Sequence, residues 1–220
     1  MFNLIMENSH DITIPHALAS GIPLLQASRV LVMLHGRGSS AEDILGLADH
    51  LQVGNFSLLA VGADNHSWYP YSFLAPREQN EPWLSASLAR VHGVVEGLLR
   101  LHYALEQLYF LGFSQGACLM LEYMARHGAR YGGAIAFTGG LIGERVDKTI
   151  YQGNFKDTPV FIGTSDPDMH VPVERVRESE AVLKEMGCEL MVKVYPGMGH
   201  TISQDEIRSA ERHVLGIANR

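Results

Sequence analysis

Short apolar runs alternate along the chain with longer stretches in which apolar residues recur at helical spacing. The runs carry few charged residues, which is typical of strands that are buried on both faces of a parallel sheet. They cover residues 29–35, 56–63, 108–114, 132–140, 158–165 and 190–197. Each run is therefore predicted to form a strand.

Amphipathic patterns predict helices between these strands. In "VERVRESEAVLKEMG", apolar and charged residues alternate at the spacing of a helix with one buried face. The expected helices cover residues 41–51, 83–102, 115–128 and 173–187, and a further helix near the C-terminus contains His213. Such an alternation of strands and helices indicates an α/β fold, with a mostly parallel central sheet and helices on both faces.

Composition and length are those of a globular protein, so the 220 residues are predicted to form one domain, 1–220. A net charge of −7 argues against binding to nucleic acid or anionic membranes, which requires clustered Lys and Arg. No apolar stretch approaches the roughly 20 residues of a membrane span. No basic residue precedes the apolar start of residues 1–11, so we expect no signal peptide and a cytoplasmic location.

The chain has two cysteines, Cys118 and Cys188, which are too far apart in sequence to form a CxxC motif. They are predicted to be thiols in a reducing compartment. The sequence alone does not decide whether Cys118 and Cys188 form a disulfide with each other.

The first candidate for chemistry is a serine between two glycines, in Gly112-Phe113-Ser114-Gln115-Gly116. It follows a predicted strand and precedes a predicted helix, which is the setting in which a G-x-S-x-G sequence presents a nucleophilic serine on a sharp turn. The alternative is a glycine-rich turn with a solvated serine. A serine nucleophile also needs a histidine base and an acid later in the chain, so these partners test the two readings.

His200 is the favoured base. It lies in the glycine-rich loop "GMGH" directly after the strand at 190–197, and loops at the carboxyl ends of strands carry function in such sheets. His127 and His213 fall in predicted helices, where a surface position explains them.

The acid is Asp168 or Asp166, which both follow the strand at 158–165. Counting back from Pro172, the usual spacing between acid and proline favours Asp168. Counting forward from Gly163, a G-x-x-D pattern favours Asp166, which also fits a turn position before Pro167. A metal site formed by the two aspartates and His170 is disfavoured by the neighbouring prolines and the lack of further ligands.

Two backbone N–H groups are needed for the oxyanion that forms during acyl transfer. Gln115, directly after the serine, is expected to supply one of them. Arg37 is expected to supply the other, because Gly36 and Gly38 allow a turn that directs its N–H inward. The alternative for "HGRG" is a plain glycine turn.

Residues 63–82 show neither strand nor helix periodicity and are rich in aromatic residues and proline. Long segments of this kind inside a domain are usually functional loops. The substrate pocket is therefore predicted to include Trp68, Tyr69, Tyr71 and Phe73. Each of these could instead be a core aromatic that covers the sheet.

With "LHGRG", "GFSQGA", the Asp168 loop and "GMGH" in this order, the chain resembles the phospholipase/carboxylesterase family of α/β hydrolases. The family also contains the acyl-protein thioesterases. The resemblance implies an α/β-hydrolase fold, no cofactor and no metal, a small-molecule ester substrate, and a homodimer. It implies a serine carboxylesterase that acts on small or medium esters through an acyl-enzyme formed by Ser114, His200 and Asp168. A thioesterase or lysophospholipase of the same family is the alternative, followed by a non-catalytic binding protein.

Two departures bear on these alternatives. Thioesterases of the family have Asp-Pro-x-Val-Pro where this chain has Asp168-Met169-His170-Val171-Pro172, and the aromatic segment resembles a bacterial esterase branch. Related dienelactone hydrolases carry cysteine where this chain has Ser114. Cys118 lies one helical turn further on and is expected to be a core residue.

Overall fold

A seven-stranded sheet with strand order β1-β3-β2-β4-β5-β6-β7 forms the centre of the molecule. The computed structural model describes residues 14–217. All neighbouring strands are parallel except β1, which pairs with β3 in the antiparallel direction. The strands are β1 (Ala17–Gly21), β2 (Val30–Leu34), β3 (Ser57–Val61), β4 (Leu108–Phe113), β5 (Gly133–Phe137), β6 (Pro159–Asp166) and β7 (Glu189–Pro196).

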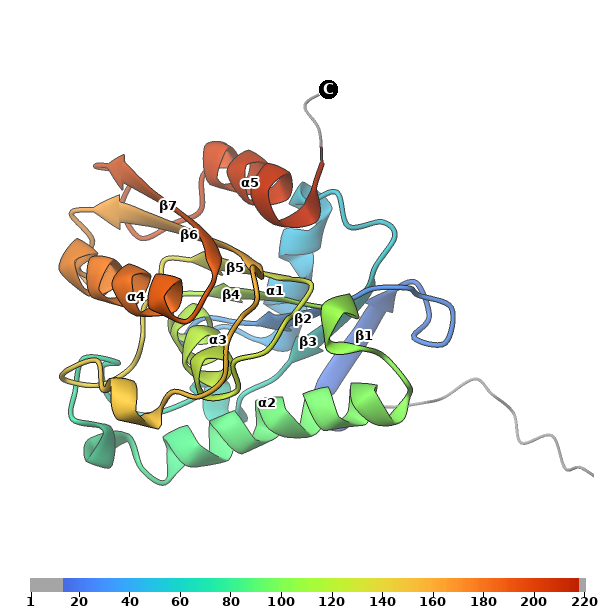
Figure 1. Ribbon diagram of the computed structural model, residues 1–220, viewed down its shortest axis with the longest axis horizontal. Helices are drawn as coiled ribbons and strands as arrows, with labels where there is room; N and C mark the ends of the chain where they lie inside the picture. The colour runs from blue at the N-terminus through green and yellow to red at the C-terminus, as the bar shows by residue number, and fades with distance from the viewer. Residues whose placement is uncertain (1–13, 218–220) are drawn as a thin grey trace, which may run out of the picture.

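Helices cover both faces of this sheet (Figure 1). They are α1 (Ala41–Gly46), α2 (Trp83–Arg100), α3 (Gln115–Arg126), α4 (Val173–Glu185) and α5 (Gln204–Ala210), with a π-helical turn at Glu211–Leu215. One core lies between the sheet and α2, α3 and α4. A second core lies between the sheet and α1, α5 and the π-helical turn. In Figure 1, α2 runs below the sheet and α5 lies above it.

The structure confirms the α/β class and the mostly parallel sheet with helices on both faces. All six predicted strands and all predicted helices form, and the helix expected at 41–51 ends its α-helical part at Gly46 and continues as a 3₁₀ turn to His50. The additional strand is β1. Its residues are mostly exposed, so they lack the apolar run on which the prediction of strands rested.

The fold does not test the predictions on the signal peptide and on the number of domains. The expectation of no signal peptide falls on residues outside the described range, and the single domain over 1–220 stays a prediction. Within residues 14–217, none of the helices combines the length and the apolar character that crossing a lipid bilayer requires.

Candidate active site

Ser114 occupies a sharp turn between β4 and α3. Its backbone has φ 53° and ψ −120°, in a region that non-glycine residues rarely adopt. The turn is fixed because the Ser114 N–H donates to the Phe137 carbonyl at 3.0 Å. Space around it is limited: a Cβ on Gly112 would lie 2.6 Å from the Ala117 Cα, and one on Gly116 would overlap the backbone at Leu34. The two glycines therefore leave the room that the sharp turn at Ser114 requires.

Gly116→Ala is expected to destabilise the protein, because the added methyl group must displace the backbone carbonyls of Leu34 and His35. Overpacking of this kind lowers the free energy of unfolding by about 3 kcal/mol. For a chain of this length that corresponds to a Tm lower by roughly 6–12 °C, measurable by calorimetry. Gly93→Ala is the matched control, since no atom lies within 4 Å of its Cβ position in α2 and alanine favours the helix. Equal Tm values for both variants would show that the loop after β2 can move away.

His200 links Ser114 to Asp168. Its Nε2 lies 2.8 Å from the Ser114 Oγ, and its Nδ1 lies 2.8 Å from the Asp168 Oδ2. The three residues follow the carboxyl ends of β4, β6 and β7, which meet because the carboxyl ends of parallel strands share one edge of the sheet. The imidazole packs between the rings of Phe113 and His170, whose centroids lie 5.2 Å and 4.8 Å away.

The Asp168 side chain is fully buried and makes hydrogen bonds through both oxygens. Its Oδ1 accepts from the N–H groups of His170 at 2.8 Å and Val171 at 2.9 Å, which fixes the carboxylate toward His200. Burial acts to raise the pKa of Asp168, but the hydrogen bonds from His200 and the two N–H groups outweigh it and lower the pKa. The Asp168 carboxylate is therefore ionised at neutral pH.

Asp166, the other acid that the sequence left open, is exposed at the end of β6. It is thus Asp168 that the fold brings to His200. No group of three or more His, Cys, Asp or Glu side chains in the described part of the chain is placed to bind a metal ion.

Arg37 and Gln115 both lie close to Ser114, the first in a neighbouring loop and the second directly after it in the chain. The loop that carries Arg37 packs against the serine, because the Cβ position of Gly36 is 3.5 Å from the Ser114 Cβ. Gly38 has φ 78° and closes the turn after Arg37, a backbone conformation that favours glycine. Gln115 begins α3, where the first N–H groups have no partner within the helix. Across residues 14–217, neither the Arg37 nor the Gln115 N–H donates to another protein group.

The side chains of Arg37 and Gln115 hold residues 67–73, which we call the aromatic strap. The Arg37 guanidinium donates to the carbonyls of Pro70 and Tyr71, both at 2.6 Å. The Gln115 amide accepts from the Trp68 N–H at 3.0 Å and donates to the Tyr69 carbonyl at 2.7 Å. The strap is therefore tied to Gln115, directly after Ser114, and to Arg37 in the loop that packs against the serine.

Further contacts of the strap come from residues that the sequence analysis did not single out. Buried Asn80 accepts from the Tyr71 N–H at 2.9 Å and donates to the Ser72 carbonyl at 3.0 Å. Ser87 on α2 donates to the Trp68 carbonyl at 2.6 Å. Neither role could be predicted from the sequence, because a buried side chain that forms hydrogen bonds with a loop backbone follows no sequence pattern.

A cavity of about 490 Å³ opens beside Ser114. Three of the four predicted aromatic residues line it, namely Tyr69, Tyr71 and Phe73. The prediction for Trp68 is wrong: this side chain is buried in the core, where its Nε1 donates to the His35 carbonyl at 2.8 Å. The other lining residues are Gly36, Arg37, Ser39, Pro70, Ser72, Phe113, Ser114, Gln115, Cys118, His170, Val171 and His200.

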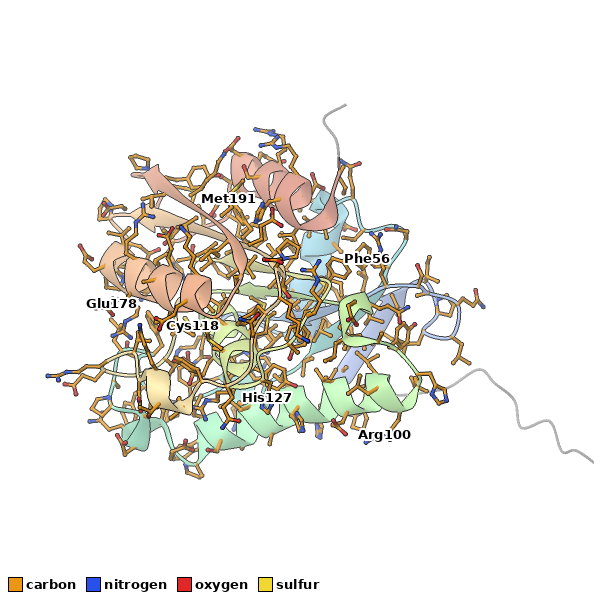
Figure 2. All side chains as sticks on the ribbon, in the orientation of Figure 1. Phe56, Arg100, Cys118, His127, Glu178 and Met191 are labelled. Carbon is orange, nitrogen blue, oxygen red and sulfur yellow. The ribbon has the colours of Figure 1, made fainter. Side chains whose placement is uncertain are left out.

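Both cysteines are free thiols. Cys118 lies on α3 (labelled in Figure 2), is buried, and also contributes to the cavity wall. Burial raises the pKa of Cys118 to about 12, so the thiol is protonated at neutral pH and is a weak nucleophile. The expectation that it packs in the core is confirmed, and Ser114 remains the nucleophile candidate at this cavity.

Comparison with known proteins points to one family. The family model for phospholipase/carboxylesterase proteins matches residues 22–216. A crystal structure of a phospholipase/carboxylesterase from Dyadobacter fermentans is 50% identical with a TM-score of 0.90, over 91% of this chain and 96% of that chain.

More distant relatives are similar over part of their length. A probable carboxylesterase SOBER1-like protein of Arabidopsis thaliana is 26% identical over 155 residues, which are 68% of this chain and 58% of that protein. Acyl-protein thioesterase 1 of Neurospora crassa is 27% identical over 140 residues, which are 61% of this chain and 56% of that protein. The matches thus span little more than half the length of these two curated relatives.

Proposed function

Because the chain belongs to the phospholipase/carboxylesterase family, we propose that it is a serine carboxylesterase that hydrolyses small or medium carboxylic esters. The observation that carries this proposal is the chain of two hydrogen bonds, each 2.8 Å long, from Ser114 through His200 to Asp168 at the cavity. Such a chain activates a serine hydroxyl, which is a poor nucleophile by itself.

In the proposed mechanism, the Ser114 Oγ attacks the acyl carbon while the His200 Nε2 accepts its proton. Asp168 accepts the Nδ1 proton of His200 in a hydrogen bond, which selects the tautomer with a free Nε2 and stabilises the imidazolium that forms. His200 then gives the proton to the leaving alcohol, and an acyl-enzyme remains. A water molecule repeats the sequence and releases the carboxylic acid.

The oxyanion that forms at each step accepts hydrogen bonds from the N–H groups of Arg37 and Gln115. Support for this role comes from their position beside Ser114 and from the lack of another acceptor for either N–H within residues 14–217. One such donor typically contributes about 3–4 kcal/mol to transition-state stabilisation.

Tyr69, Tyr71 and Phe73 form an apolar wall for one part of the ester. A cavity of about 490 Å³ accepts groups of small or medium size. A thioesterase uses the same chemistry, and a relative named acyl-protein thioesterase 1 is the reason to test it. The cytoplasmic location and the homodimer remain predictions.

A fluorophosphonate probe is expected to label the protein on the peptide that contains Ser114, identified by mass spectrometry. The reason is that the probe reacts with serines activated by a neighbouring base. A panel of acetyl to dodecanoyl esters and the matching thioesters then defines acyl length and ester against thioester preference. A chain that binds esters but is neither labelled nor active would be a non-catalytic binding protein.

A further inference from the structure

Arg37 carries a positive charge on the wall of the cavity beside Ser114. No carboxylate of residues 14–217 forms an ion pair with it, and its side chain donates to the carbonyls of Pro70 and Tyr71. By contrast, six other arginines of the described structure form ion pairs with carboxylates, namely Arg77, Arg90, Arg126, Arg175, Arg177 and Arg208.

Two carboxylates lie close in sequence to residues that line the cavity, and both have other hydrogen-bond partners. Asp168 is bonded to His200, and Asp43 accepts from the Ser39 hydroxyl at 2.9 Å and the Ser40 N–H at 3.0 Å. Neutral carbonyls satisfy hydrogen-bond donors but do not neutralise charge, so the exposed guanidinium keeps its positive charge, which water and salt screen in part.

The contacts with the strap also prepare the guanidinium for binding. A guanidinium has five N–H donors in a planar fork, and the two carbonyls occupy one donor on each terminal nitrogen of Arg37. Other donors remain for a ligand, and two short bonds fix the direction of the group, which lowers the conformational entropy that binding would otherwise cost. Planar, pre-oriented guanidinium groups suit carboxylates and phosphates.

We propose that Arg37 is an anion-recognition site and that the preferred substrates are esters carrying a carboxylate or phosphate on the part that enters this cavity. This inference rests on the proposed esterase function and names its substrate class. The anionic oxygens lie against the free donors of the guanidinium while the ester carbonyl lies at Ser114. The strap then forms the aromatic wall, and its carbonyls also position the Arg37 guanidinium that binds the anion.

The test uses pairs of substrates that differ mainly in charge. Monoethyl glutarate and ethyl 5-oxohexanoate have the same shape, and the first carries a carboxylate where the second carries a methyl ketone. A second pair, 1-butyrylglycerol 3-phosphate and 1-butyrylglycerol, places a phosphate on the alcohol side. The wild-type protein is expected to prefer the anionic member of at least one pair by about tenfold or more in kcat/KM, mainly through KM. The preference falls as ionic strength rises.

Two variants separate the charge of Arg37 from its structural role. Arg37→Lys keeps the charge but cannot bridge both carbonyls, whereas Arg37→Gln loses the charge and can reach at most one of them. Both are expected to hydrolyse the neutral ester more slowly than the wild type. The preference for the anionic ester should survive largely in Arg37→Lys and fall to about unity in Arg37→Gln. Arg130→Gln is the control, since its guanidinium donates to the Asp157 carbonyl in a turn that does not line the cavity.

The outcomes separate this inference from the proposed function. Wild-type hydrolysis of both members of each pair without preference would overturn the anion site and leave the esterase intact. Parallel losses on charged and neutral esters in both Arg37 variants would also overturn it, because the side chain would then act only on the strap. Failure of the proposed function would appear differently, as absence of hydrolysis of every ester and of fluorophosphonate labelling.

Discussion

Replacement of Ser114 by alanine is expected to lower kcat for p-nitrophenyl acetate and butyrate by about 10⁴-fold or more. The variant lacks the oxygen that attacks the acyl carbon, so only water can attack. Some acceleration over the uncatalysed reaction should remain, because the N–H groups proposed for the oxyanion are backbone groups that the substitution keeps. KM should change little, since the other residues that line the cavity are unaffected.

A loss of this size must be separated from misfolding. Alanine has the same backbone requirement as serine at this turn, and the Ser114 N–H still donates to the Phe137 carbonyl. The Tm of Ser114→Ala should therefore stay within a few degrees of the wild-type value. Ser85→Ala on the exposed side of α2 is the matched control, and its activity should equal that of the wild type. Comparable rates for Ser114→Ala and the wild type would refute the assignment of the nucleophile.

The strands and the turn at Ser114 could be predicted because their signals are local. A buried parallel strand is an apolar run in the sequence. The glycines around Ser114 are required because a Cβ there would collide with atoms a few residues away or at the end of the neighbouring strand. The chain order of serine, acid and histidine then limited the possible partners to a few loops. Asp168 and Asp166 could not be separated fully, because the direction of two side chains in one loop depends on backbone N–H groups that no spacing reveals.

The aromatic strap shows where prediction from sequence ends. Its conformation depends on Arg37, Asn80 and Gln115, which are distant from one another in the chain and meet only in the fold. Trp68 was therefore expected in the cavity but lies in the core, since the Gln115 amide and Ser87 fix its backbone there. Strand β1 escaped prediction for a related reason: it pairs at the edge of the sheet and buries little of its own surface.

Asp168→Asn is expected to lower kcat for the same esters by about 10⁴-fold, with a small change in KM. Asparagine presents either an amide N–H or a carbonyl oxygen to His200. If Oδ1 continues to accept from the N–H groups of His170 and Val171, the amide nitrogen faces Nδ1 and donates to it. The imidazole must then carry its proton on Nε2, toward Ser114, where it cannot act as the base. Asp166→Asn is the control, and because Asp166 is exposed at the end of β6, its kinetics should match the wild type. The opposite pattern would assign the acid to Asp166.

The two variants should also differ in how their stability depends on pH. Because the pKa of Asp168 is lowered in the folded protein, its ionisation stabilises the fold above the unfolded-state pKa of about 3.9. This stabilisation is lost as the pH falls from there through the lower folded-state pKa. The difference in Tm between the wild type and Asp168→Asn should thus be largest near neutral pH and should shrink as the pH falls below about 4. A difference that stayed constant over this range would mean that the carboxylate charge contributes nothing to the link between Asp168 and His200.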